Sequence, residues 1–388
     1  MKILYRSTIF AVAGFLSVLS CSCGGGGKTA SLFTDTLYMP VFADGFSVFG
    51  CGESSVLSVR NPWQGAENVD MNLFLRRAGE QPPKDFEGAV VDVPLKKVVC
   101  MSSSYVAFIS ALGEEETIKG VSGVSYITNG NVRGRFAKGL LRDVGYDSNM
   151  NYEVLAELRP DLVFLYGVYG DNSAMTRKLD ELGIKYIYIG DYVEQSPLGK
   201  AEWLVAFGEM FDRREQAADI FDSVRYNYER LCDDVRARTV ILSSAKPKVM
   251  LNAPYRDTWF VPGDRSYMVR LIRDAQGEYA CAGVDSQQSR PISVESAYIF
   301  ANSSDVWLNP GQASTKVDLL AENPRFGEIP PVVNGRVFNC NKRGTSEGGS
   351  DFWESGAVRP DIVLKDMVKI FYPWMYPDYE PYYFNKVE

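Results

Sequence analysis

The chain has 388 residues, of which 46% are hydrophobic and 13% aromatic, so it can build the packed cores of two domains. Its formal net charge is −8 and it has no basic run, which argues against a nucleic-acid partner, whose phosphates require a positive face. It contains no histidine, which excludes His-ligated zinc, axial-His haem, Ser-His-Asp triads and Cys-His dyads.

Residues 1–20 have the pattern of a signal peptide. Two basic residues precede the apolar stretch IFAVAGFLSVL, which is too short to span a bilayer. The stretch VLSCSCGGGGK that follows resembles a bacterial lipobox, in which a cysteine becomes the lipidated N-terminus; Cys21 is the better candidate and Cys23 the second. Residues 21–30, which include four consecutive glycines, would then be the tether of a lipid anchor. The alternative is an ordinary secretory signal with a chance cysteine.

Residues 31–95 predict a β-rich N-terminal segment. The short alternating stretches FSVFG, SSVLSVRN and VDMNLFLRR are separated by Gly, Asn and Pro, as strands and turns are.

Residues 96–197 alternate between strand and helix patterns. The strand patterns are KKVVCMS, IKGVSG, DLVFLYG and KYIYIG, and the helix patterns are SYVAFISALG, NYEVLAELR and SAMTRKLDELG. Such alternation implies a parallel sheet covered by helices, which makes this part an N-terminal α/β lobe.

Residues 198–243 contain no proline and carry apolar residues at helical intervals, which predicts a long bridging helix with one break near Asp212. A second α/β run occupies residues 244–388. Its helix patterns are SYMVRLIRDAQG, VESAYIFAN and DIVLKDMVKIFYP, and its strand patterns are KPKVML, SDVWLN and GRVFNC. The predicted fold class is α/β: two lobes with mostly parallel sheets, bridged by a long helix, plus the β-rich N-terminal segment.

The stretch NYEVLAELRPDLVF resembles the N-lobe signature of the periplasmic binding proteins that serve ABC importers of siderophores and cobalamin, whose lobes are bridged by a rigid helix. In that family a Glu opens the helix and a Pro-Asp pair precedes the strand, as Glu153 and Pro160-Asp161 do here. The resemblance extends over roughly residues 96–373, through SPLGKAEWLVAFGEMFDRREQA at the start of the bridge to FWESGAVRPDIVLKDMVKIFYP at the end. The C-lobe acid Glu295 lies ten residues before Asp305, whereas Glu153 lies eight before Asp161, so the two lobes are only approximately equivalent.

The resemblance implies an exported, monomeric bacterial lipoprotein at the periplasmic face of a membrane. It would capture an iron(III)-siderophore-type complex and deliver it to the permease of an ABC importer, with no cofactor of its own and no catalysis. Glu153 and Glu295 match the family's exposed acids that pair with arginines of the permease. The alternative for each acid is a favourable interaction with the helix dipole, worth about 0.3–1 kcal/mol.

Ligands of open α/β sheets bind at the carboxyl ends of the strands, and the loops expected there are rich in aromatic and small polar side chains. Such faces suit a large planar or chelated ligand. Arginines near the same loops would pair with carboxylate or catecholate oxygens of the ligand. The alternative for each arginine is a solvated loop residue, and the alternative for each aromatic side chain is burial in the hydrophobic core. The candidate ligand-binding residues are Ser103, Tyr126, Arg133, Tyr166, Tyr169, Tyr192, Tyr255, Trp259, Arg290 and Trp353.

Other functions stay open. A corrinoid such as vitamin B12 is an alternative ligand, and bare metal held by tyrosinate and carboxylate oxygens is another. From a different class, the chain could be a surface lipoprotein with a glycan-binding or hydrolytic role. The missing histidine argues against hydrolysis, and the two-lobe pattern argues against a β-rich glycan binder.

Overall fold

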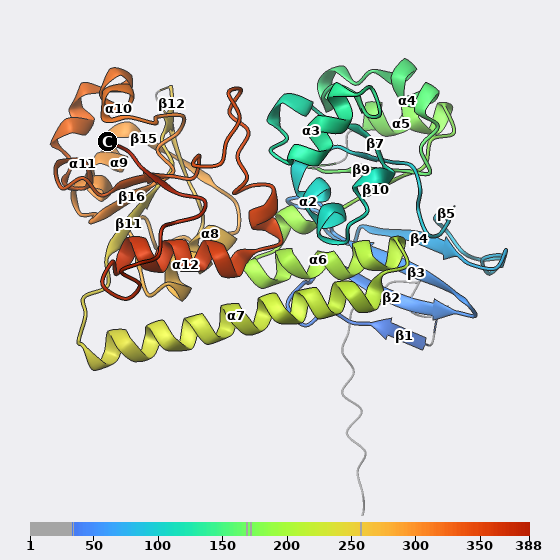
Figure 1. Ribbon diagram of the computed structural model, residues 1–388, viewed down its shortest axis with the longest axis horizontal. Coiled ribbons are helices and arrows are strands. Elements are labelled where there is room, and N and C mark those ends of the chain that lie inside the picture. Colours follow the sequence, from blue (N-terminus) through green and yellow to red (C-terminus); the bar gives the residue numbers. More distant parts are fainter. Residues whose placement is uncertain (1–32, 34, 168–169, 171–172, 257) are drawn as a thin grey trace, which may run out of the picture.

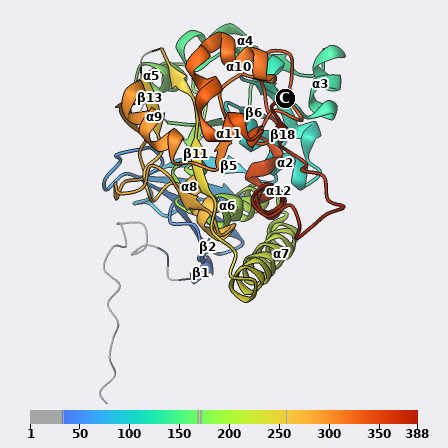
Figure 2. The same ribbon diagram turned by 90° about the vertical axis from the view of Figure 1, so that its left-hand side faces the viewer.

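The computed structural model describes residues 33, 35–167, 170, 173–256 and 258–388. Two α/β lobes stand side by side and are joined along one side by α7 (Arg214–Ile241) (Figure 1). The view turned by 90° shows α7 nearly end-on, below the lobes (Figure 2). The predicted fold class is confirmed.

The N lobe contains a parallel sheet in the order β10-β9-β6-β7-β8. Its central strands are buried along their whole length, as strands covered on both faces are. The strands are β6 (Val98–Cys100), β7 (Ile118–Val121), β8 (Arg142–Asp143), β9 (Leu162–Leu165) and β10 (Tyr186–Tyr188), and the helices between them are α2 (Ser103–Ala111), α3 (Gly130–Ala137), α4 (Tyr152–Leu158) and α5 (Ser173–Glu181).

The C lobe repeats this plan with the strand order β14-β11-β16-β17-β18, in which only the β17–β18 pair is antiparallel. A small antiparallel sheet, β12-β13-β15, packs beside it. The strands are β11 (Lys248–Leu251), β12 (Pro254–Tyr255), β13 (Thr258–Val261), β14 (Glu278–Tyr279), β15 (Arg290–Ser293), β16 (Val306–Leu308), β17 (Val337–Asn339) and β18 (Asn385–Lys386). The helices are α8 (Tyr267–Asp274), α9 (Val294–Asn302), α10 (Lys316–Glu322), α11 (Pro330–Val333) and α12 (Pro360–Phe371).

The segment predicted as a long bridging helix with one break near Asp212 consists of two helices. The first, α6 (Pro197–Met210), is almost wholly buried. The chain turns at residues 211–213, where Asp212 has a left-handed φ of 57°, and α7 then runs for 28 residues, or about 42 Å, to the C lobe. There the hydroxyl of Tyr228 donates to Asp274 over 2.8 Å. Within the described residues no helix is both long and apolar enough to cross a membrane.

The N-terminal segment forms a five-stranded sheet against α6 (Figure 1). Phe46 packs on Trp203 with ring centroids 4.9 Å apart. The buried carboxylate of Glu202 on α6 accepts hydrogen bonds from the backbone N–H groups of residues 41–43. These contacts make the sheet an integral part of the N lobe. Its strands are β1 (Asp35–Tyr38), β2 (Phe46–Cys51), β3 (Ser54–Arg60), β4 (Asp70–Arg76) and β5 (Ala89–Asp92).

Candidate ligand-binding cleft

A cavity of about 190 Å³, which we call the interlobe pocket, is lined by side chains of both lobes. It lies beside the loops that follow β10 in the N lobe and β11 in the C lobe, so the carboxyl ends of parallel strands contribute to it, as in other open α/β proteins. The N-terminal sheet and the N lobe supply Gln64, Tyr192, Val193 and Glu194, and the C lobe supplies Asn252, Pro262, Arg265, Ser266, Tyr267, Met268, Gln287, Ser289 and Trp353.

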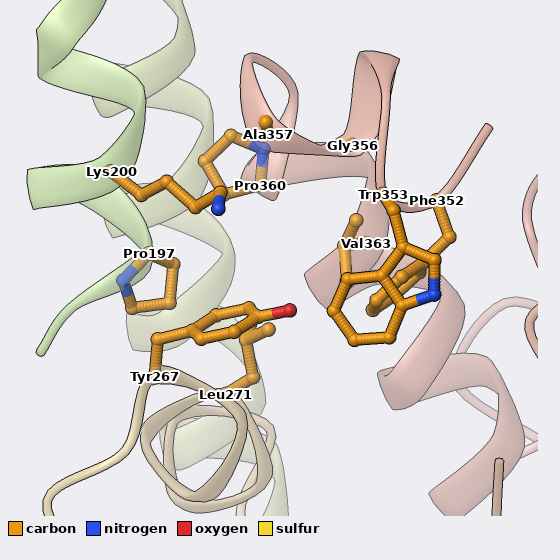
Figure 3. Close-up of a pocket in the computed structure, with 10 residues that line it drawn as sticks. All are labelled: Pro197, Lys200, Tyr267, Leu271, Phe352, Trp353, Gly356, Ala357, Pro360 and Val363. Carbon is orange, nitrogen blue, oxygen red and sulfur yellow. The ribbon is translucent and has the colours of Figure 1, made fainter. Parts of the chain in front are cut away.

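Three aromatic side chains form much of the pocket wall. Tyr192 is 41% exposed and Trp353 is 45% exposed, so both rings have free surface to offer a ligand. Tyr267 meets Trp353 edge to face, with centroids 6.4 Å apart. A gap of about 10 Å³ adjoins them, and in the close-up the hydroxyl end of Tyr267 points towards Trp353 across it (Figure 3). Such an aromatic wall suits a planar or largely apolar ligand.

Charged groups lie beside this wall and at its rim. Beside Tyr267, the Lys200 ammonium forms an ion pair with buried Asp191 over 3.1 Å and lies 5.5 Å from the centre of the Tyr267 ring. At the rim, Arg265 pairs with Asp285 over 2.8 Å, and both side chains are exposed. Because an exposed ion pair contributes little stability, Arg265 can turn to an anionic ligand group at small cost.

The carboxylate of Glu194, which lines the pocket, is held by the N-terminal sheet. It accepts from the backbone N–H groups of Asp44 and Gly45, each over 3.0 Å, and from the Trp203 indole over 2.9 Å. Burial raises the pKa of Glu194 to about 7, although these hydrogen bonds act in the opposite direction.

On the other side of the cleft the lobes touch directly. The C-lobe carboxylate of Glu354 accepts from the backbone N–H groups of Thr128 and Asn129 in the N lobe, over 2.7 and 2.9 Å. Burial raises the pKa of Glu354 to about 7. A polar groove of about 700 Å³ lies beside this contact, and its two arginines, Arg343 and Arg359, are already paired with Asp351 and Asp361.

The structure brings two of the predicted ligand-binding residues, Tyr192 and Trp353, into the interlobe pocket. The other predicted tyrosines that it describes lie elsewhere. Tyr126 packs edge to face on Tyr146, the Tyr166 hydroxyl lies 3.5 Å from an Asp147 oxygen, and Tyr255 is 67% exposed on the β12–β13 hairpin.

The remaining polar candidates do not line this pocket. Ser103 begins α2 and is half-buried. Arg133 is exposed on α3, so it belongs to a helix and not to a loop, and Arg290 is half-buried in β15. Tyr169 and Cys21 lie outside the described residues.

The prediction for Trp259 is corrected. Its side chain is fully buried in the C-lobe core, 5.6 Å from the Trp307 ring and 6.1 Å from the Phe326 ring. Its indole N–H donates to the carbonyl of Leu251 over 2.9 Å. Side chains alternate along a strand, so Trp259 points inward from β13 and the neighbouring Phe260 points out.

Sequence reasoning missed most of the pocket residues, among them Tyr267 and Gln64. Tyr267 is the first residue of α8, directly after the N-cap Ser266. The first residue of a helix is a position where an aromatic side chain can line a cleft. The helical pattern of the sequence alone does not show that Tyr267 does so. Gln64 lies in the β3–β4 loop, far from the lobes in sequence, and no local signal points to it.

The two acids matched to permease docking occupy similar places. Glu153 and Glu295 are exposed in the first turns of α4 and α9. Each helix leads to an aspartate that holds the first strand of its own lobe: Asp161 accepts from the N–H of Lys97 over 2.9 Å, and Asp305 accepts from the N–H of Lys248 over 2.8 Å. The approximate equivalence of the two sequence positions is therefore also a structural one.

Comparison with known proteins gives a consistent picture. Residues 98–343 match the sequence profile of a family described as periplasmic binding proteins, which confirms the resemblance seen in the sequence. An uncharacterised lipoprotein of Methanocaldococcus jannaschii is 28% identical over 306 residues, covering 76% of this chain and 70% of the relative.

Solved structures share the fold at low sequence identity. A periplasmic heme binding protein from Pseudomonas aeruginosa is similar with a TM-score of 0.57 and 18% identity, covering 76% of this chain and 98% of that protein. A protein of an ABC-type Fe3+-hydroxamate transport system from Saccharomonospora viridis is similar with a TM-score of 0.54 and 17% identity, covering 72% of this chain and 94% of that protein.

Proposed function

Because this chain belongs to the periplasmic binding protein family, we propose that it captures an iron(III) chelate and delivers it to an ABC importer. The observation that carries the proposal is the interlobe pocket, in which Tyr192 of the N lobe faces Tyr267 and Trp353 of the C lobe. Aromatic faces from both lobes can enclose the organic part of a chelate, and Arg265 at the rim can pair with its anionic oxygens. Similar proteins named for heme and for Fe3+-hydroxamate support this ligand class.

The pocket must widen to hold such a ligand, since its volume of about 190 Å³ is below the range of about 300–1,000 Å³ usual for small-molecule sites. The exposed side chains of Trp353 and Arg265 can swing outward without any movement of the lobes. The Glu354 contact is a second element that can shift locally, because few hydrogen bonds join the lobes there: two backbone groups donate to Glu354, and the Thr128 hydroxyl donates to Asp351 over 3.3 Å.

We also propose that the chain is lipid-anchored through Cys21 and works at the periplasmic face of a membrane. The lipobox-like sequence supports this, as does the similar lipoprotein of Methanocaldococcus jannaschii. Expression of the full chain with labelled fatty acid tests the anchor: Cys21→Ala should abolish labelling, and continued labelling would assign the anchor to Cys23.

Ligand capture is tested with the chain lacking residues 1–32. It is titrated with ferrichrome, hemin and cyanocobalamin, and binding is followed by tryptophan fluorescence and by absorbance that persists through gel filtration. We expect at least one of the two ferric probes to bind with a Kd of about 1 μM or below. Trp353→Ala should weaken that binding about tenfold or more, because its ring lines the pocket.

The matched control is Trp374→Ala, since Trp374 has nearly the same exposure but is absent from the pocket lining. Binding of cyanocobalamin alone would replace the iron chelate with a corrinoid. Binding of none of the three probes would refute the proposal.

A further inference from the structure

The N-terminal sheet ends at Asp92, before the part of the chain that matches the family begins at residue 98. The heme binding protein and the Fe3+-hydroxamate transport protein described above match over 98% and 94% of their own length but cover only 76% and 72% of this chain. We propose that the β3–β4 loop of this sheet, residues 61–69, is a wall of the interlobe pocket and that Gln64 selects among chelates by hydrogen bonding to their oxygen-rich edge. This inference rests on the proposed function.

The loop is seated on the carboxyl ends of two N-lobe strands. Trp63 forms a parallel bridge with Gly167, which follows β9, and its ring meets that of Tyr188 on β10 edge to face at 5.1 Å. Pro62 lies under Gly190, where a Cβ would come within 3.3 Å of the proline Cα. The loop therefore occupies the edge of the sheet at which ligands of this architecture bind.

The loop is held in one conformation by its own hydrogen bonds. Asn61 has a left-handed φ of 46°, its N–H donates to the carbonyl of Val69 over 2.8 Å, and its side-chain oxygen accepts from the N–H of Val69 over 3.0 Å. At the tip, the N–H of Ala66 donates to the carbonyl of Trp63 over 3.1 Å. A wall fixed in this way loses little conformational freedom when a ligand binds.

From this support Gln64 reaches the pocket. Its carboxamide N–H donates to the Tyr192 hydroxyl over 3.0 Å, and both side chains line the cavity. The next residue faces the C lobe, since a Cβ on Gly65 would lie 4.0 Å from the side-chain nitrogen of Gln288. The loop thus extends from the N lobe towards the C-lobe segment that contributes Gln287 and Ser289 to the pocket.

The chemistry of Gln64 fits an oxygen-rich ligand. A primary amide offers two N–H donors and a carbonyl acceptor, so one N–H can hold Tyr192 while the other meets a carbonyl or carboxylate of the chelate. Arg265, on the C-lobe side of the same pocket, adds a positive charge. A polar contact that a bound ligand covers discriminates strongly between ligands, because a ligand without the matching group leaves the covered amide unpaired.

A purely structural role for the sheet is the competing explanation. The sheet is already attached to the N lobe by other contacts, because Glu202 and Glu209 of α6 accept hydrogen bonds from Tyr38, Phe42 and Ser55. Those contacts hold the sheet without any need for the β3–β4 loop to reach a cavity between the lobes. The position of the loop is therefore accounted for by the pocket.

The test uses the chain lacking residues 1–32 with hemin and ferrichrome as probes. Gln64→Ala should weaken binding of the probe that wild type prefers by about fivefold or more and should change the ratio of the two affinities. Gln64→Glu should weaken hemin binding further, because its carboxylate would face the propionates of that probe. Gln81→Ala is the control, since Gln81 is exposed on another loop of the same sheet and its side chain donates to the carbonyl of Gly79 over 3.4 Å.

The outcomes separate the two proposals. Wild-type binding with unchanged affinities in both Gln64 variants would overturn this inference and leave the proposed function standing. Failure of wild type to bind either probe would overturn the proposed function, and the selectivity inferred for Gln64 with it. Thermal unfolding of the Gln64 variants should match wild type, because a side chain that acts on ligands contributes little to the fold.

Discussion

Replacing Glu202 should loosen the N-terminal sheet from α6. Its carboxylate is fully buried and accepts four hydrogen bonds: one oxygen accepts from the Tyr38 hydroxyl and the Val41 N–H, both over 2.9 Å, and the other accepts from the N–H groups of Phe42 and Ala43 over 2.7 and 2.8 Å. All four donors belong to the chain between β1 and β2 or to its edge.

The size of the effect follows from which donors lose their acceptor. In Glu202→Gln the side-chain NH2 can take the place of the oxygen beside Tyr38, whose hydroxyl can turn and accept, so only the Val41 N–H is left unpaired. Val41 is 78% exposed, so its N–H can turn to water, and the expected loss in the free energy of unfolding is about 1 kcal/mol, the low end for an unpaired N–H. Glu202→Ala also leaves the better-buried N–H groups of Phe42 and Ala43 unpaired, so its loss should be on the order of 2–6 kcal/mol.

Urea denaturation followed by circular dichroism measures these losses in the chain lacking residues 1–32, and hydrogen exchange of the amides of residues 41–43 locates them. The control is Glu229→Gln, an exposed position on α7 where the change should stay within about 0.5 kcal/mol. A loss below about 1 kcal/mol in Glu202→Ala, with unchanged protection of the three amides, would refute the reasoning.

Three further predictions concern docking, motion and pH. Glu153→Ala and Glu295→Ala should leave ligand affinity unchanged and reduce uptake in cells several-fold, because both acids are exposed and lie outside the pocket. Substitution by Lys at either position should reduce uptake further, and a loss of ligand binding in any of these variants would contradict the prediction. The continuous helix α7 should keep the lobes in place, so the radius of gyration from small-angle scattering should fall by less than about 1 Å when ligand binds, and a larger fall would indicate hinge closure. Burial raises the pKa of Glu354 from its ordinary 4.5 to about 7. Between these pH values the folded chain holds a proton that the unfolded chain has lost. Glu354 therefore makes the free energy of unfolding fall as the pH rises from about 4.5 to about 7. Urea denaturation of Glu354→Gln across that window should show a flatter pH dependence, and an unchanged slope would rule this out.

Most elements and their order could be predicted from the amino-acid sequence, because these depend on local patterns. The stretch VESAYIFAN is the whole of α9, and the break predicted near Asp212 is the turn between α6 and α7. Some elements have no such prediction: α10, α11 and the small sheet β12-β13-β15 are missed, and the α3 segment is interpreted as a loop. Its two glycines lower helix propensity, but the Asn129 side chain caps its start by accepting from the N–H groups of Asn131 and Val132.

Which side chains meet could not be predicted in the same way. A strand pattern shows that Trp259 is apolar but not which sheet covers it, so core and pocket aromatics look alike until the lobes are assembled; Trp259 proved to be core, whereas Tyr267 at the start of a helix lines the pocket. Gln64 and Tyr192 are 128 residues apart, and Glu202 lies about 160 residues from the amides that it binds. Such contacts leave no periodic trace in the sequence, because they depend on how the N-terminal sheet docks on the lobe and not on the residues next to them in the chain.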